Sequence, residues 1–409
     1  MFSRRLLLTL VLVMVLLVGA PASAQEPVTI TFLTPAWGVP PDEAALQAFT
    51  EETGITVEIQ SVQMADLYSR VQVAAAAGEP AADVIFLTEE APSNVVATGN
   101  MLPLNDYIAD SDMSDFNQMD FWTQDGNIYG IPVYQQLVMM DYNTERLAEA
   151  GFDAPPTTWD ELREMAVAIK EQGIDEYPIV MGSNFDWAWY LMALSMGDPM
   201  FDEELNPVFA DEGSQARRAM ELLLSFYRDE LISPEILAGS VTQHALFWSG
   251  SGTFHQGWQG SMDYGNNTEL SQQAPNVGYM VLPEVGNTWS FPAAIGISAA
   301  SEYPDEAWQF IEWYTSPENQ VAIFNAFGLY PSRTSVAEQL NEEGVINGYE
   351  EIVAQSELVN ELPRYALWWG PFTQTVSETI LQAAQSDMSA DEVIDALAEE
   401  WNTLKEEYE

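Results

Sequence analysis

Strand and helix signals alternate along this chain, and this alternation constrains its fold more than any other feature. The β-rich segments 28–33 and 55–59 flank a helical stretch from about Asp42 to Glu52. A third β-rich segment, 83–87, follows another helical stretch that ends at Gly78. This β-α-β order is typical of a doubly wound α/β sheet, because parallel strands need a helical crossover. With 409 residues, the chain is predicted to form two lobes.

Helix starts are marked by capping signals. Thr158 with Glu161, and Ser389 with Glu392, fit the capping box, in which a hydroxyl and a carboxylate satisfy free backbone amides. Apolar residues at helical spacing are predicted to pack in the core. Four tryptophans on such helix signals are assigned to the core: Trp159, Trp308, Trp313 and Trp401.

The first 24 residues are predicted to be a secretory signal peptide. Arg4 and Arg5 precede an apolar run from Leu6 to Val18, and Ala22–Ala24 offers a small-residue cleavage site before Gln25. The apolar run is short for a bilayer span, so an uncleaved anchor is the weaker alternative. The chain has no cysteine for a bacterial lipid anchor. We therefore expect a soluble periplasmic product, secreted across the inner membrane.

The chain is strongly acidic, with 63 Asp and Glu against 12 Lys and Arg and a formal net charge of -51. Such a surface repels nucleic acid and anionic lipid, so neither is an expected partner. A hydrophobic fraction of 47% nevertheless predicts a folded chain. We interpret the acidity as a solubility adaptation, and attraction of a cationic ligand is the alternative. The lack of cysteine excludes disulfides and zinc-thiolate sites.

No catalytic motif is recognisable. The two histidines, His244 and His255, have no metal-ligand spacing, and Gly250-Ser251-Gly252 is too short for a G-x-S-x-G nucleophile elbow. No Walker-type loop or G-x-G-x-x-G follows a strand. Paired carboxylates, as in a secreted carbohydrate-active hydrolase, stay an open alternative because sequence does not give their separation. We expect no enzyme activity, no catalytic residue, no metal and no cofactor.

Several tryptophans occur in loop-like contexts, and this placement predicts a ligand site. Trp37 adjoins Gly38, and Trp258 lies between Gly257 and Gln259-Gly260. Similar surroundings of glycine, proline or polar residues hold Trp187, Trp189, Trp289, Trp368 and Trp369. Flat rings beside polar groups suit a pocket that stacks on an apolar ligand face and orients its polar edge. Sugars have such faces, and organic cations also bind to aromatic rings.

Segments across nearly the whole chain after the leader resemble the bacterial extracellular solute-binding proteins of the maltose-binding type. The most specific ones are DGNIYGIP at 125–132, MDYN at 140–143 and PPTTWDEL at 155–162. Further matches follow in the family's order at 150–152, 247–257, 294–298, 306–311, 316–318 and 328–333. Proteins of this family deliver their ligands to ABC importers.

The resemblance implies the fold of type II periplasmic binding proteins, in which two doubly wound α/β lobes are joined by a multi-strand hinge. The N-terminal lobe would comprise 25–131 and 284–328, and the C-terminal lobe 132–283 and 329–409. Crossings near Ile131 to Tyr134, Met280 to Pro283 and Leu329 to Pro331 would let the lobes close on a ligand.

The resemblance and the tryptophan pattern together predict the ligand-binding residues. They are Trp37, Glu89, Glu90, Tyr134, Gln135, Phe185, Trp187, Trp258, Trp289, Trp368 and Trp369. The implied function is that of a monomeric receptor that binds a mono- or oligosaccharide between its lobes and passes it to an ABC-transporter permease. A polyamine or other cationic solute, facing carboxylates such as Glu89, is the alternative ligand in the same fold.

Overall fold

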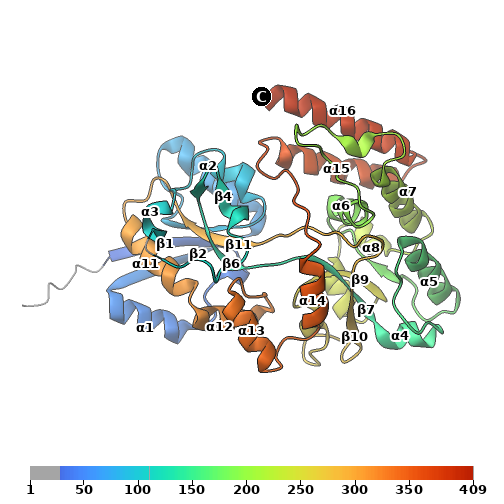
Figure 1. Cartoon of the computed structure of the whole chain (residues 1–409), viewed down its shortest axis with the longest axis horizontal. Helices are drawn as coiled ribbons and strands as arrows, with labels where there is room; N and C mark the ends of the chain where they lie inside the picture. The colour runs from blue at the N-terminus through green and yellow to red at the C-terminus, as the bar shows by residue number, and fades with distance from the viewer. Residues whose placement is uncertain (1–27, 110, 409) are drawn as a thin grey trace, which may run out of the picture.

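The computed structural model describes residues 28–109 and 111–408, so the predicted signal peptide lies outside the described residues. Two α/β lobes lie side by side, joined by crossing segments and by helices between them (Figure 1). The prediction of two α/β lobes is therefore confirmed. None of the helices in the described ranges is both long and apolar enough to span a membrane.

The first lobe is built on a five-stranded sheet with the order β2-β1-β3-β11-β6. Its parallel strands β1 (Val28–Thr34), β2 (Ile55–Ser61) and β3 (Val84–Leu87) confirm the three predicted strands. The remaining strands, β11 (Ala293–Ile297) and β6 (Ile131–Tyr134), pair antiparallel with each other, and β11 is also antiparallel to β3. The lobe is thus assembled from distant parts of the chain.

The helices of the first lobe cover this sheet. They are α1 (Glu43–Thr53), α2 (Met64–Ala77), α3 (Asn105–Ile108), α11 (Pro304–Tyr314) and α12 (Pro317–Phe327). Asp42 begins α1 because its carboxylate accepts the backbone N–H groups of Ala44 and Ala45 at 2.9 and 3.0 Å. Gly54, at φ +75°, ends the helix in a conformation that favours glycine.

The second lobe has a four-stranded sheet with the order β10-β7-β9-β8. Its strands are β7 (Val138–Asn143), β8 (Ile179–Val180), β9 (Phe254–Trp258) and β10 (Val277–Met280). The β7 strand is antiparallel to both of its neighbours, β9 and β10. Its residues are therefore held from both sides, and most of them are buried.

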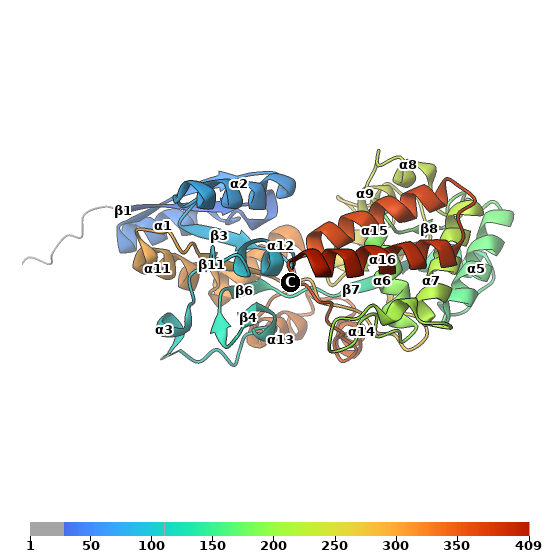
Figure 2. The same ribbon diagram turned by 90° about the horizontal axis from the view of Figure 1, so that it is seen from above.

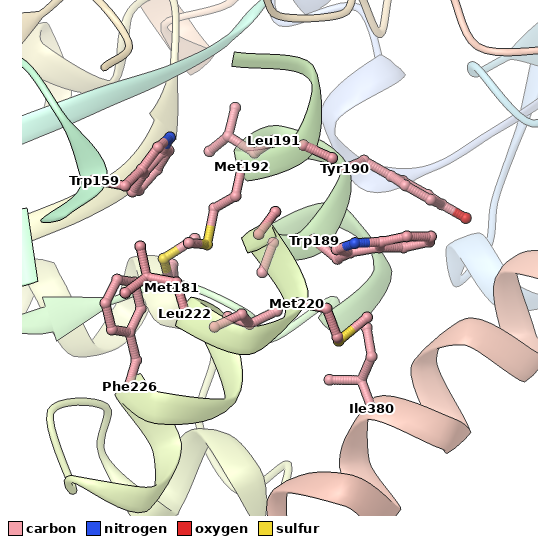
Figure 3. Packing of buried hydrophobic residues seen from close by; sticks show 14 of the residues in the cluster. Trp159, Met181, Trp189, Tyr190, Leu191, Met192, Met220, Leu222, Phe226 and Ile380 are labelled. Carbon is pink, nitrogen blue, oxygen red and sulfur yellow. The ribbon is translucent and has the colours of Figure 1, made fainter. Parts of the chain in front are cut away.

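The helices of the second lobe form most of its core. They are α4 (Thr144–Glu149), α5 (Trp159–Glu171), α6 (Phe185–Ser195), α7 (Gln215–Arg228), α8 (Pro234–Leu237), α9 (Gln243–Trp248), α10 (Ser261–Gly265), α15 (Trp369–Ala384) and α16 (Ala390–Tyr408). Both long C-terminal helices, α15 and α16, run across this lobe (Figure 2). Figure 3 shows Trp159 and Trp189 packed among methionine and leucine side chains. Trp189, expected in a loop, lies within α6 and is fully buried.

The two predicted capping boxes form with one difference. Ser389 and Glu392 satisfy each other's backbone amides, with distances of 2.8 and 3.3 Å, as the sequence predicts. At α5, the hydroxyl of Thr158 accepts the Glu161 amide at 3.1 Å. The Glu161 carboxylate instead accepts the amide and hydroxyl of Thr157, at 2.8 and 2.7 Å. The Glu161 carboxylate therefore binds Thr157, one residue before the predicted partner Thr158.

A hinge cluster lies between the lobes. It consists of α13 (Thr334–Glu342) and α14 (Tyr349–Ser356) packed with Leu137, Met139 and Tyr330. The crossing segments bond to one another here: the Gln135 amide donates to the Tyr330 carbonyl at 3.0 Å, and the Phe291 amide to the Gln136 carbonyl at 2.8 Å. The hinge is thus built from three neighbouring segments.

Strand pairing places two crossings later in the chain than the sequence suggested. The β6 strand stays in the first sheet up to Tyr134, which pairs with Ala293. After Met280 the chain remains on the second lobe, since Glu284 bonds to Thr157 and Trp289 packs in that core. We therefore propose lobe boundaries near 134/135 and 292/293 in place of 131/132 and 283/284.

We predict that Asp83→Ala destabilises the first lobe. The buried carboxylate of Asp83 accepts bonds from the amide and hydroxyl of Thr31, at 2.8 and 2.9 Å, and from the Ser301 hydroxyl at 2.7 Å. Loss of these charge-assisted bonds should lower the free energy of unfolding by about 3 kcal/mol, measured by urea denaturation. The exposed Asp387→Ala variant serves as control and should change it by less than about 0.5 kcal/mol. Equal effects would contradict the prediction.

Candidate ligand-binding site

A cavity of about 830 Å³ lies between the two lobes. The first lobe lines it with Trp37, Glu89 and Tyr134, which follow β1, follow β3 and end β6, respectively. The second lobe contributes Trp187 at the start of α6 and Trp258 at the end of β9. Ligands of open α/β sheets bind at such strand ends. The volume falls in the range of about 300 to 1,000 Å³ that is typical of small-molecule sites.

Aromatic side chains face this cavity from both lobes. Trp37 remains 36% exposed, and its neighbour Gly38 has no room for a side chain, because a Cβ would lie 2.2 Å from the Thr34 hydroxyl. Across the cavity, Trp187 is held edge-on by Trp289 at 5.4 Å and by Phe291 at 5.2 Å between ring centroids. Trp187 is thus braced by two neighbouring rings, and Trp37 keeps part of its surface exposed.

Trp258 is anchored by its backbone while its ring lines the cavity. Its carbonyl accepts the hydroxyls of Ser261 at 2.7 Å and Tyr279 at 3.0 Å. The ring packs edge-on against His244 at 4.8 Å and Trp248 at 5.6 Å. The backbone of Trp258 is therefore held by hydrogen bonds, whereas its ring makes packing contacts.

Three N–H donors at the cavity have no hydrogen-bond partner among the described residues. They are Nε2 of Gln136, Nε2 of Gln256 and the indole Nε1 of Trp258. The other end of the Gln256 amide is fixed, since its oxygen accepts the Gly182 amide at 3.3 Å. Buried donors are costly unless they are paired. These nitrogen atoms are themselves buried, so they pair with a ligand acceptor only if their side chains turn toward the cavity.

Carboxyl groups occupy one end of the cavity. Burial raises the pKa of Glu89 to about 7, while the Arg364 guanidinium opposes this rise and Glu90 adds to it. Burial also raises the pKa of Asp186 to about 6, opposed by a bond from the Ser377 hydroxyl at 3.0 Å. These carboxyls therefore take up protons near neutral pH more readily than free ones. They line a second cavity of about 340 Å³ that adjoins the first.

The structure brings six of the predicted site residues to the large cavity: Trp37, Glu89, Glu90, Tyr134, Trp187 and Trp258. Burial raises the pKa of the Tyr134 hydroxyl, and nearby Glu89 raises it further, while a bond with the Trp37 side chain opposes both. These three side chains are thus close neighbours. Trp369 lines only the smaller cavity, beside Arg364.

The other predicted residues do not reach the large cavity. Trp289 has no exposed surface because it packs behind Trp187. Trp368 packs on Trp401 with ring centroids 5.6 Å apart, and Phe185 packs on Tyr227. Gln135 lines a separate cavity of about 420 Å³ behind the hinge.

Sequence reasoning missed most of the polar lining. The missed residues include Thr88, Gln136, Ser183, Asn184, Gln243, His244 and Gln256. For Gln136 the signal was available, because consecutive residues of an extended segment face opposite sides, and Gln135 was chosen instead. His244 was set aside because it lacked metal-ligand spacing.

Comparisons with known proteins agree with this architecture. Residues 44–348 match the family model described as bacterial extracellular solute-binding protein. A maltotriose-binding protein of Pyrococcus abyssi is 23% identical over 349 residues, covering 82% of this chain and 73% of the relative. A probable amino-acid ABC transporter periplasmic-binding protein of Sinorhizobium fredii is 24% identical over 335 residues, 76% of each chain. The structure of maltose-bound T. maritima MalE3 has a TM-score of 0.79 at 21% identity, covering 92% of this chain and 100% of that one.

We predict that Trp258→Ala weakens ligand binding at least tenfold, because a desolvated stacking face contributes about 2 kcal/mol. The melting temperature should fall by only a few degrees, since the backbone bonds of residue 258 remain. Titration calorimetry and thermal melts measure both effects. Trp308→Ala is the control, because Trp308 stacks on Tyr107 in the first lobe, away from the cavity lining. Unfolding of the Trp258 variant, or unchanged affinity, would contradict this placement.

Proposed function

This chain belongs to the bacterial extracellular solute-binding protein family, and we propose that it is a receptor for a mono- or oligosaccharide. It acts as a soluble periplasmic monomer, captures the sugar between its lobes and passes it to the permease of an ABC importer. Binding shifts the balance between open and closed lobes. The receptor performs no chemical step on its ligand.

One observation carries the choice of a carbohydrate: aromatic rings and side chains with unpaired N–H donors line one cavity. The apolar face of a sugar ring stacks on rings such as Trp258 and Trp187. Its hydroxyl oxygens accept bonds from the unpaired donors of Gln136 and Gln256 when these amides turn toward the ligand. Sugar hydroxyl groups also donate hydrogen bonds, which the carboxyl groups near Glu89 accept.

The same donors disfavour a polyamine. An ammonium group has N–H donors and no acceptor, so it leaves Gln136, Gln256 and Trp258 unpaired. The carboxyl groups at this end of the cavity also attract a cation only weakly. The raised pKa of Glu89 reduces its negative charge near neutral pH, and buried Arg364 adds a positive charge there.

The names of the related proteins indicate which sugars to test first. The maltotriose-binding relative and the maltose-bound structural neighbour both point to glucose oligosaccharides as candidates. The second cavity, which shares Glu89, Glu90, Asn184 and Trp187 with the first, supports a ligand of more than one ring. The relative described as an amino-acid transporter protein makes amino acids a necessary comparison.

We predict that maltose or maltotriose raises the melting temperature, whereas putrescine, spermidine and a set of amino acids do not. A ligand at about 100 times its dissociation constant adds roughly 2.7 kcal/mol to stability, so the shift is readily seen by thermal melting. Chromatography of the recovered sugar should show it intact. Stabilisation by polyamines or amino acids alone would refute the carbohydrate receptor, and cleavage of the sugar would indicate a hydrolase.

We also predict that added salt stabilises the fold but leaves sugar affinity nearly unchanged. The net charge of -51 causes self-repulsion that counterions screen, so the melting temperature should rise with salt. A neutral sugar has no charge for salt to screen. Calorimetry at low and high sodium chloride measures the affinity, and a steep loss of binding with salt would favour a cationic ligand.

A further inference from the structure

Three side chains of the second lobe form a hydrogen-bonded row that ends at the cavity. Asp141 on β7 and His255 on β9 lie opposite each other in register, and both side chains are fully buried. The Nδ1 atom of His255 lies 2.9 Å from Oδ2 of Asp141. Its Nε2 atom lies 2.9 Å from Nδ1 of His244, a residue of α9 that lines the cavity.

The surroundings hold this row in place. The ring of Phe247 stacks on His255 at 4.4 Å and 6° between planes, and Trp248 stacks on His244 at 5.7 Å. The Ser261 hydroxyl lies 2.7 to 2.8 Å from the two Asp141 oxygens. At residue 257 a Cβ would lie 2.8 Å from Oδ2 of Asp141, so the row needs the glycine found there.

Each of the two gaps in the row holds one proton, and this leaves two consistent arrangements. In the first, His255 donates to an ionised Asp141 and His244 donates to His255, so Nε2 of His244 is a bare acceptor. In the second, Asp141 is protonated and every bond reverses, so Nε2 of His244 becomes a donor. The protonation state of Asp141 therefore decides whether Nε2 of His244 acts toward a ligand as a hydrogen-bond acceptor or as a donor.

We propose that Asp141 and His255 are positioning residues that hold His244 as a hydrogen-bond acceptor, and that Nε2 of His244 binds a ligand hydroxyl group. The ligand part of this inference rests on the proposed carbohydrate receptor. The row itself stands on the geometry of the free protein. His244 thereby selects solutes that carry a hydroxyl donor at that position.

The hydrogen bonds that Asp141 receives favour the first arrangement, and the burial of its carboxyl group opposes it. An ionised Asp141 receives the His255 N–H and competes with the Trp258 carbonyl for the single proton of the Ser261 hydroxyl, and such bonds favour the charged carboxylate. Burial lowers the pKa of His255 to about 3 and that of His244 well below 6.5, where the positive charge of His255 would lower it further. Both rings are therefore neutral near pH 7.

Acidification is the condition that reverses the row. Burial raises the pKa of Asp141 above its usual range, and the Ser261 bond opposes this rise. The other titratable groups that face Asp141 are Asp263 on α10 and Tyr279 on β10. Neither group can carry a positive charge that would stabilise an ionised Asp141. A lower pH therefore adds a proton to Asp141 first, and His244 then turns from acceptor to donor.

Nitrogen NMR of the free protein tests the row directly. The chain has two histidines, so labelling with ¹⁵N-histidine gives only four ring nitrogens when no histidine tag is present. At about pH 8 we expect Nδ1 protonated and Nε2 unprotonated in both rings. A proton on Nε2 of His244, or a charged ring, would overturn the proposal.

The pH titration adds a second criterion. On acidification both rings should change tautomer together with a single midpoint, because one proton reverses both bonds. In Asp141→Asn, which cannot ionise, this joint transition should be absent. Two separate midpoints in the parent protein would disprove the row, and this result does not depend on whether the variant folds.

Binding variants test the ligand contact, with maltotriose as the probe. His244→Leu removes the acceptor and should weaken binding roughly tenfold, whereas His244→Gln keeps an acceptor oxygen and should recover most of the affinity. Equal affinity in both variants and the parent would exclude the contact. Failure of the parent protein to bind any panel sugar would refute the proposed function, while the ring-nitrogen result would still decide the row.

Discussion

The short crossing between β6 and β7 is the constraint on which the rest of the structure depends. The chain leaves the first sheet at Tyr134 and enters the second at Val138, so three residues must span the lobes. Backbone bonds from Gln135 to Tyr330 and from Phe291 to Gln136 tie the other two crossings to this one. Because an extended segment alternates its side chains, Gln136 faces the cavity while Gln135 faces the back of the hinge. The positions of the hinge and the cleft therefore follow from one stretch of backbone.

In the part of the chain that the structure describes, buried polar groups lack partners both at the cleft and in the cores of the lobes. Within the cores some buried polar groups are paired, as Trp159 is with Ser195 and Trp189 with the Ala216 carbonyl. Others, such as the indole Nε1 atoms of Trp122 and Trp289, have no partner among the described residues. Gln136 and Gln256, which line the cavity, likewise leave buried donors without partners in the described structure. Polar groups left unpaired in this way lower stability, and a ligand restores the missing bonds only where it reaches them.

Local signals were sufficient for the three parallel strands of the first lobe, for the helix starts and for the presence of two lobes. They failed where the outcome depends on tertiary packing. Nothing near Trp289 in the sequence reveals that Trp187 will cover it, and Trp368 is buried by Trp401 from a later helix. The second crossing was placed too early for the same reason, because burial of Trp289 keeps that segment on the second lobe. The two histidines are brought together only when α9 packs against β9.

Glycine explains how the lobes meet beside the cleft. Gly260, at φ +92°, lies so close to the end of α12 that a Cβ would sit 2.1 Å from the carbonyl oxygen of Gly328. Gly328 itself ends α12 at φ +65°, so both backbones adopt conformations that favour glycine. A larger residue at position 260 would hold the lobes apart at this contact. The same short loop follows Trp258 and carries Ser261, which bonds to Asp141. One segment of four residues, 258–261, therefore contains the glycine at which the lobes approach, the stacking ring and the hydroxyl that bonds to the buried Asp141.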